Sequence, residues 1–168
     1  LELHDNFADK TEFQQICQYL NSFSITRVGE QLRIDAIALR YVSKKPHQYQ
    51  QTAQLLTQLV DLPIILCCWD PQVVRGALQA IREFHPLIYA VTPATLDQFA
   101  EIALEFDIPL VCFAESLDMI GGMLRVLTEM GVRDLVIDSG SFLSPSEFPT
   151  TFNRYQEIRF RLFENNED

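Results

Sequence analysis

Three prolines placed 23 residues apart constrain the fold of this chain more than any other feature. Pro63, Pro86 and Pro109 each open a short apolar run, and a fourth run, residues 134–138, follows about one period later. The runs do not alternate with polar residues, which is typical of strands buried on both faces of a parallel sheet. The sequence therefore predicts parallel strands that recur at a fixed interval.

The segments between the runs carry apolar side chains at helical spacing. In residues 71–84, Val74, Leu78 and Ile81 recur at intervals of three or four residues, which places them on one face of a helix. Helices are predicted over residues 10–23, 47–60, 71–84, 96–106, 117–130 and 152–163. Further strands are predicted at residues 1–3 and 32–42.

Polar residues mark the expected helix ends. Asp70 and Thr92 each precede a proline, and Ser116 directly precedes an apolar stripe, so each offers a capping oxygen to a first helical turn. Gly131 fits the left-handed conformation in which many helices end.

Strand and helix alternate six times along the chain. Because crossovers between parallel strands are right-handed, this order predicts an α/β fold built as a parallel (β/α) repeat. We predict a TIM-barrel-like domain that is partial, with about six of the eight units of a closed barrel, so that residues 1–168 form one barrel-type domain or fragment. Periodicity alone leaves a doubly wound open sheet as the alternative. Open sheet edges favour a dimer, or cover by another chain.

The acidic composition narrows the classes of partner. The 168 residues include 13 Lys and Arg against 23 Asp and Glu, a net charge of −10. Nucleic acid is not an expected partner, because phosphate contacts need clustered basic side chains and these are scattered. No apolar run approaches the roughly 18 residues that span a bilayer, so no membrane partner is expected either.

The four cysteines do not predict a metal site. Cys17, Cys67, Cys68 and Cys112 contain no Cys-x-x-Cys pair, and adjacent Cys67 and Cys68 would point to opposite faces of a strand. Three of them lie in strongly apolar segments, where they are expected to be buried thiols. Such thiols fit a reducing, cytoplasmic setting.

Several segments, in the same order along the chain, resemble a known family. They are RVGEQLRIDAIALRYVS at 27–43, DLPIILCCWDP at 61–71, HPLIYAVT at 85–92, EMGVRDLVIDSGS at 129–141 and TTFNRYQEIRF at 150–160. The chain resembles the central TIM-barrel domain of the large (gamma) subunit of the corrinoid iron–sulfur protein, part of the acetyl-CoA decarbonylase/synthase (CO dehydrogenase/acetyl-CoA synthase) complex. It departs from the family pattern at Cys68-Trp69, where the family has Cys-Ser, and at Ser139-Gly140, where it has Pro-Gly.

This resemblance implies a role in methyl transfer in one-carbon metabolism. The full subunit joins an iron–sulfur module, this barrel and a corrinoid-binding domain, and carries methyl groups from a methyltetrahydropterin methyltransferase to acetyl-CoA synthase in the Wood–Ljungdahl pathway. Cobalamin and a 4Fe-4S cluster are implied for the full-length family only, with no cofactor in this chain. The chain is then a non-catalytic scaffold, with a small-subunit barrel, the corrinoid domain, the methyltransferase and acetyl-CoA synthase as protein partners.

Polar side chains also follow the ends of the predicted strands, where ligands bind in α/β folds. The ligand-binding candidates are Asp70, Trp69, Thr92, Glu115, Asp138 and Ser139. The three carboxylates are expected on one rim, where they would hold the amide-like donors of a pterin ring, as in related pterin-binding barrels. The alternative functions are therefore a pterin-binding methyltransferase-like enzyme, or an unrelated doubly wound α/β binding domain. Capping alone is a sufficient reason for Asp70.

No histidine is expected at a strand end. His4, His47 and His85 fall before or between the predicted strands, so a nucleophile activated by histidine is poorly supported and catalytic residues are unknown. Arg33 and Asp35 lie two residues apart in the predicted strand 32–42, and an interior salt bridge on one face is the simplest interpretation of this pair.

Overall fold

The fold is an α/β repeat with an additional hairpin. The computed structural model describes residues 1–140, 146 and 148–164, with side chains as far as residue 161. The strands are β1 (Glu2–His4), β2 (Ser24–Arg27), β3 (Glu30–Arg33), β4 (Ile37–Arg40), β5 (Ile64–Cys67), β6 (Leu87–Val91), β7 (Leu110–Phe113) and β8 (Leu135–Asp138). The helices are α1 (Lys10–Ser22), α2 (Pro46–Leu59), α3 (Pro71–Ile81), the 3-10 turn η1 (Arg82–Phe84), α4 (Leu96–Phe106), α5 (Leu117–Met130) and α6 (Phe148–Glu164).

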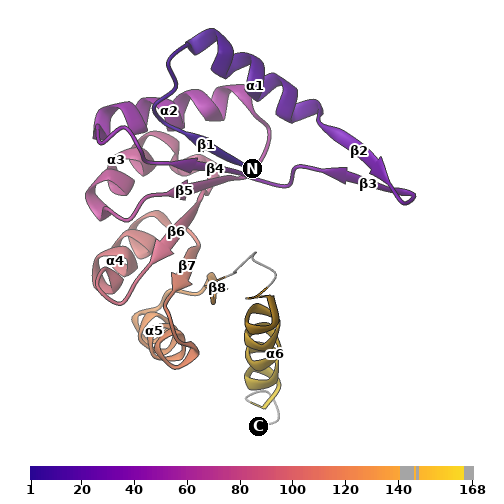
Figure 1. Ribbon diagram of the computed structural model, residues 1–168. Helices are drawn as coiled ribbons and strands as arrows, with labels where there is room; N and C mark the ends of the chain where they lie inside the picture. Colours follow the sequence, from indigo (N-terminus) through magenta and orange to yellow (C-terminus); the bar gives the residue numbers. More distant parts are fainter. Residues whose placement is uncertain (141–145, 147, 165–168) are drawn as a thin grey trace.

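Six of the strands form one parallel sheet in the order β1-β4-β5-β6-β7-β8. Each strand therefore lies beside its predecessor in the repeat, with β1 and β8 at the two edges. Helices α1 to α5 lie along one side of the strands, and α6 follows β8 at the far end (Figure 1). The predicted α/β class and the partial, TIM-barrel-like repeat are confirmed.

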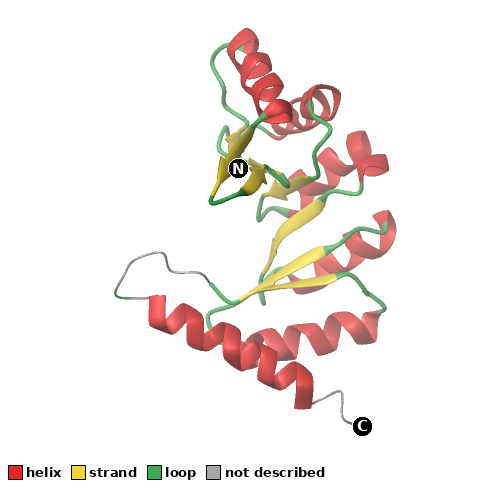
Figure 2. Ribbon diagram, turned by 90° about the vertical axis from the view of Figure 1, so that its right-hand side faces the viewer, coloured by secondary structure: helices red, strands yellow, loops and turns green. Residues whose placement is uncertain are grey.

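The core lies between the strands and the helices. Leu39, Leu66, Ile88 and Leu110 of neighbouring strands are fully buried there, and the Tyr49 hydroxyl donates to the Leu39 carbonyl oxygen at 3.0 Å. Because side chains alternate across a strand, the residues between these positions point to the other face, which we call the inner face. Figure 2 shows the strands in the middle of the molecule and α6, which ends near the C label, at its base.

The capping predictions hold at three of four positions. Asp70 accepts a hydrogen bond from the Gln72 amide at 2.9 Å, Ser116 accepts one from the Met119 amide at 3.2 Å, and Gly131 ends α5 with φ of 101°. The prediction for Thr92 is wrong, because a turn separates it from α4. The Thr95 amide donates to the Thr92 carbonyl oxygen at 3.0 Å, and Thr95 occupies the N-cap position.

The hairpin β2–β3 was not predicted from the sequence. Its strands pair in antiparallel register, with Ile25 opposite Leu32, and project away from the main sheet (Figure 1). The two turn residues, Val28 and Gly29, have φ of 51° and 83°, as the two-residue turns of tight hairpins require. A valine rarely adopts this conformation, which is why the turn signal was weak.

The predicted strand 32–42 is therefore divided between two sheets. Arg33 ends β3 and donates to the Gln31 side-chain oxygen at 3.0 Å, while Asp35 lies in the connection before β4. The expected interior salt bridge between Arg33 and Asp35 is wrong for this reason. Among the described residues, no helix is both long and apolar enough to cross a membrane.

Candidate functional site

Polar and ionisable side chains gather on the inner face near the C-terminal ends of the strands. In strand register, His4 lies beside Arg40, Arg40 beside Cys67, and Cys67 beside Tyr89. We call the whole group the strand-end cluster; it consists of Glu2, His4, Arg40, Cys67, Tyr89 and Asp138. The parallel register thus places residues that are distant in sequence at one edge of the sheet.

An ion pair occupies the β1 side of the strand-end cluster. The Arg40 guanidinium donates from Nε and Nη2 to the two Glu2 carboxylate oxygens, both at 2.7 Å, and His4 Nε2 lies 3.1 Å from Glu2 Oε1. These partners, Arg40 foremost, lower the pKa of Glu2 from 4.5 to about 2, and the same pairing raises the pKa of Arg40. Glu2 is therefore a charged acceptor at neutral pH.

A second polar contact occupies the β8 side. Tyr89 Oη donates to Asp138 Oδ2 at 2.7 Å, and the Gly140 amide donates to Asp138 Oδ1 at 2.8 Å. Burial first, and then the hydrogen bond to Asp138, raises the pKa of Tyr89 to about 12. The Tyr89 phenol thus keeps its proton at neutral pH and holds the Asp138 carboxylate in place.

Cys67 lies between these two contacts and is not a prepared nucleophile. Burial raises the pKa of its thiol to about 11, so the thiol is protonated at neutral pH. His4 contacts Glu2, and its ring is not within hydrogen-bond distance of a described thiol or hydroxyl. Cys67 is therefore not activated as a nucleophile in this arrangement.

The prediction that no histidine lies at a strand end is wrong for His4. It is the last residue of β1 and belongs to the strand-end cluster. The expected strand at residues 1–3 is confirmed as Glu2–His4, one residue further along the chain. Because the strand extends one residue further than predicted, His4 belongs to the sheet and pairs with Arg40.

Among the described residues, three of the predicted ligand-binding residues make no side-chain hydrogen bond to the strand-end cluster. They are Asp70, Trp69 and Thr92. The Asp70 carboxylate caps α3 by accepting from the Gln72 and Val73 amides, and neighbouring Trp69 is 58% exposed. The Thr92 hydroxyl pairs with the Thr95 hydroxyl at 3.1 Å. Their roles in ligand binding stay predictions.

The other three predicted residues, Asp138, Ser139 and Glu115, lie at or just after the ends of β7 and β8. A residue of α6 connects these two strand ends. Arg154 of α6 donates to the Ser139 carbonyl oxygen and, at 3.1 Å, to the Glu115 carbonyl oxygen. The Ser139 hydroxyl is buried and has no hydrogen-bond partner among the described residues. Arg154 therefore joins the ends of β7 and β8, the latter carrying Asp138, and sequence reasoning did not identify it.

Sequence reasoning also missed Asp5, which is 0% exposed. Its carboxylate accepts hydrogen bonds from the Val42 amide (2.7 Å), the Ser43 amide (2.8 Å) and the Ser43 hydroxyl (2.5 Å). These bonds tie the end of β1 to the loop after β4, beside Arg40. A carboxylate buried with full hydrogen bonding organises its loop and is not available to a ligand.

The acidic groups of the strand-end cluster already have hydrogen-bond partners within the chain. In the part of the chain that the structure describes, no three His, Cys, Asp or Glu side chains are placed to hold a metal. Both acidic groups already accept from Arg40 or Tyr89. By strand alternation Tyr89 lies on the inner face, and helices α1 to α5 lie on the other side of the strands (Figure 1). The cluster thus offers fixed acceptors beside an aromatic surface.

Comparison with known proteins assigns the family. A sequence model described as the CO dehydrogenase/acetyl-CoA synthase delta subunit matches residues 1–168. The gamma 2 subunit of the acetyl-CoA decarbonylase/synthase complex of Methanosarcina thermophila is 31% identical over 133 residues, 79% of this chain and 28% of that protein. The gamma subunit of Methanothermobacter thermautotrophicus is 30% identical over 169 residues, 100% of this chain and 36% of its own length.

A further relative is similar to this chain over a comparable share of its length. The corrinoid/iron–sulfur protein large subunit of Moorella thermoacetica is 26% identical over 141 residues, 84% of this chain and 31% of that protein. The chain thus spans about a third of the length of the relatives it matches. The resemblance given by the sequence segments is confirmed, and the chain belongs to the CO dehydrogenase/acetyl-CoA synthase delta-subunit family, whose relatives include gamma and corrinoid-protein large subunits.

Proposed function

We propose that this chain is a non-catalytic barrel scaffold of a corrinoid protein that carries methyl groups between a methyltetrahydropterin methyltransferase and acetyl-CoA synthase. The observation that carries the proposal is the family match over all 168 residues. The relatives are named as subunits of the acetyl-CoA decarbonylase/synthase complex, which supports a role inside an assembly. On this proposal the chain works in the Wood–Ljungdahl pathway.

The thiols of this chain do not fit the 4Fe-4S cluster that the resemblance implies for full-length relatives. Such a cluster needs four converging thiolates. Cys67 lies on the inner face, whereas Cys68 and Cys112 lie in the core between sheet and helices, and burial raises the pKa of all three to about 11. We therefore propose that such a cluster is held elsewhere in the protein or its complex, and the resemblance assigns cobalamin to a separate corrinoid domain. The four free cysteines support a cytoplasmic location.

The partners follow from the scaffold role. A small-subunit barrel is the proposed direct partner, and the corrinoid domain, the methyltransferase and acetyl-CoA synthase are the proposed mobile or transient ones. The open order of the sheet, with β1 and β8 at its edges, supports cover by another structural unit, because unpaired strand edges invite association.

Sedimentation velocity with the purified small subunit of the complex tests this proposal. The chain is expected to form a discrete complex with the small subunit and, after desalting, to retain no cobalamin absorbance. A chain that stays monomeric at every mixing ratio would contradict the partner assignment. A chain that retains cobalamin in stoichiometric amount would contradict the scaffold role.

The strand-end cluster supports a second candidate function, binding of a pterin. The observation in its favour is the Asp138 carboxylate, held by Tyr89 at 2.7 Å on the face that α1 to α5 leave uncovered. A carboxylate beside an aromatic ring matches the donors and the flat shape of a pterin.

Calorimetric titration with a tetrahydropterin separates the two functions. If the cluster binds the pterin, Asp138→Ala abolishes the binding heat, while Asp61→Ala, which removes an exposed carboxylate before the start of β5, leaves it in place. The wild-type chain showing no binding heat would remove this candidate and leave the scaffold role. Equal loss in both variants would point to damaged folding, which thermal melting of each variant detects.

A further inference from the structure

Arg40 keeps one guanidinium nitrogen that the described part of the chain does not use. Its Nε and Nη2 donate to the two Glu2 carboxylate oxygens, and no hydrogen bond joins Nη1 to a described residue. The Arg40 side chain is 42% exposed, so a ligand has access to it. Because a guanidinium carries five N–H donors in a fixed fork, Glu2 orients Arg40 without using all of its donors.

The strand register connects Arg40 to the other end of the strand-end cluster. Arg40, Cys67 and Tyr89 lie side by side on three neighbouring strands. Strands in a sheet are about 4.8 Å apart, so the backbones of Arg40 and Tyr89 are separated by about 10 Å. The Tyr89 hydroxyl in turn donates to Asp138. A ligand held at Asp138 is thus long enough to reach Arg40 if it extends along this row by about 10 Å.

The surface between the two ends is uncharged. Cys67 is 7% exposed, and burial raises the pKa of its thiol to about 11, so the thiol carries no charge at neutral pH. The row therefore has a carboxylate acceptor at Asp138, a neutral middle and a cationic donor at Arg40. A complementary ligand carries hydrogen-bond donors at one end and an anionic group at the other.

A free anion fits Arg40 less well than an anion attached to a ring. The Glu2 carboxylate already neutralises much of the Arg40 charge, so a separate anion gains little from binding there. An anionic group attached to a ring at Asp138 is instead presented to Arg40 at high effective concentration. The arrangement favours one molecule that contacts both ends of the row.

We propose that the strand-end cluster binds a two-ended ligand, with a planar, donor-bearing ring at Asp138 and an anionic group at Arg40. The proposal rests on pterin binding, the second candidate function given above, and adds the chemical class of the rest of the ligand. Arg40 is then the residue that distinguishes ligands with an anionic tail from ligands without one.

The test compares two pterins by calorimetric titration. 6-Methyltetrahydropterin has no anionic group, whereas tetrahydrofolate joins the same ring to a tail that ends in carboxylates. The wild-type chain is expected to bind tetrahydrofolate about tenfold or more tightly, as a hydrogen bond between charged groups contributes that much affinity. Arg40→Gln is expected to bind the two pterins about equally.

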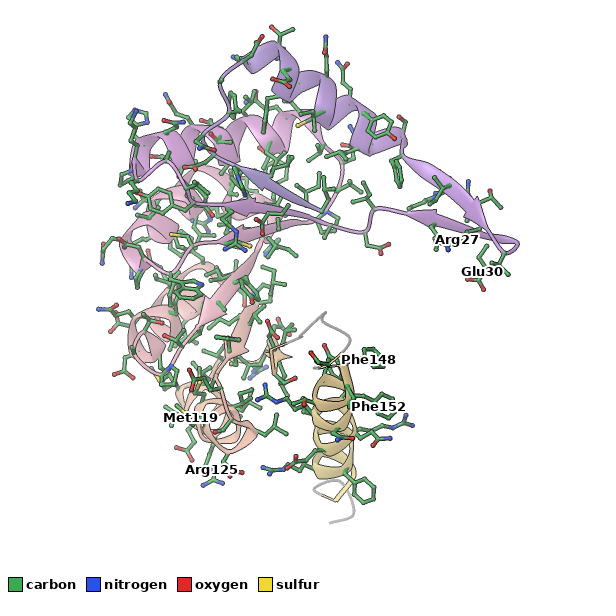
Figure 3. All side chains as sticks on the ribbon, viewed as in Figure 1. Arg27, Glu30, Met119, Arg125, Phe148 and Phe152 are labelled. Atoms are coloured by element: carbon green, nitrogen blue, oxygen red, sulfur yellow. The ribbon has the colours of Figure 1, made fainter. Side chains whose placement is uncertain are left out.

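The matched control is Arg27→Gln, which removes the same charge elsewhere. Arg27 is an exposed residue of β2 near the tip of the projecting hairpin (Figure 3). This variant is expected to keep the preference for tetrahydrofolate. Loss of the preference in Arg27→Gln would overturn the proposal, because the effect would then come from the overall charge of the chain.

A second variant separates ligand binding from the structural role of the ion pair. Glu2→Gln also breaks the pair, but it keeps Arg40 and removes the carboxylate that competes for it. It is expected to bind tetrahydrofolate more tightly than wild type. A loss of preference as large as in Arg40→Gln would overturn the proposal, since the pair would then act only by holding β1 in place. Thermal melting checks folding, and if Arg40→Gln does not fold, the Glu2→Gln result decides.

The wild-type titrations distinguish failure of this proposal from failure of pterin binding. Equal affinity for the two pterins would overturn the anionic end and leave pterin binding intact. No binding of either pterin would remove both and leave the scaffold role. Inorganic phosphate alone is expected to give no binding heat. Phosphate binding that Arg40→Gln abolishes would overturn the two-ended ligand and make Arg40 part of a separate anion site.

Discussion

The α2–α3 pair and the α5–α6 pair are built in opposite ways. Along α2 and α3 the large apolar side chains are buried or half-buried, and the two helices pack closely along their length. Between α5 and α6 lies a groove of about 540 Å³, with Gly121 and Gly122 on its α5 wall. Added Cβ atoms at these glycines would meet nothing within 4 Å. The same chain thus has closely packed helices at one place and a partly exposed helix beside an open groove at another.

This difference indicates a division of roles. Burial of apolar area stabilises the α2–α3 region, whereas hydrogen bonds and ion pairs of Arg154 and Arg161 attach α6. Exposed ion pairs contribute little free energy, so the pairs of Arg161 stabilise α6 less than apolar burial stabilises α2 and α3. The following predictions test that contrast, from the largest expected effect to the smallest.

The same substitution is expected to have unequal effects in the two regions. Leu78 of α3 is fully buried, so Leu78→Ala should lower the free energy of unfolding by about 4 kcal/mol. Leu124 of α5 is half-buried beside the groove, so Leu124→Ala should lower it by only about 1 kcal/mol, because little new cavity forms. Urea denaturation measures both. Equal losses would contradict the contrast.

Removing a buried polar side chain should likewise lower the free energy of unfolding more than removing an exposed one. Asp5→Ala should lower the free energy of unfolding by about 3 kcal/mol, because it leaves the Val42 and Ser43 donors without their acceptor in a buried place. Arg161→Ala removes a solvent-exposed pair and should lower the free energy of unfolding far less. Asp5→Asn is the control that keeps one acceptor, and its loss should fall between the two. Denaturation of the three variants in parallel gives the ranking, and an Arg161→Ala loss as large as that of Asp5→Ala would reverse it.

Alanine substitutions at two glycines, one within α5 and one at its C-cap, should change the free energy of unfolding in opposite directions. Gly122→Ala should raise the free energy of unfolding by up to about 1 kcal/mol, because alanine favours the helix and the added methyl group enters open space. Gly131→Ala should lower it by about 1 kcal/mol, because Gly131 has φ of 101°. Thermal melting is sufficient to see both shifts. A destabilised Gly122→Ala would show that the groove closes in solution.

The smallest expected effect is a pH dependence at the edge strand β1. The pKa of Glu2 is lowered from 4.5 to about 2 in the folded chain, so the ion pair contributes stability that is fully present above pH 4.5 and is lost as the pH falls toward 2. The Glu2→Gln variant should therefore be less stable than wild type at pH 6, by under about 1 kcal/mol because the pair is half exposed. The difference between the two should shrink as the pH falls from 4.5 toward 2. A difference that stays constant over this range would rule out the ion pair as its cause.

Local features of the sequence predicted the repeat but not the hairpin or the site. The prolines that recur every 23 residues and the caps at Asp70 and Ser116 can be recognised without knowing which distant residues are in contact. They correctly predicted β5 to β8 and the helices between them. The hairpin depends on Val28 in a left-handed conformation, which propensity argues against. Glu2 and Arg40 are 38 residues apart, and only the pairing of β1 with β4 brings them together.

The sequence by itself determined the parallel (β/α) order, the acidic surface and the family, because periodicity, charge and segment similarity are properties of the chain alone. Only the tertiary structure decided that His4, Arg40 and Tyr89 share one inner face, and that Phe148 and Phe152 are turned outward from α5. The physical reason is that register and helix attachment depend on contacts between residues distant along the chain. No local pattern encodes such contacts.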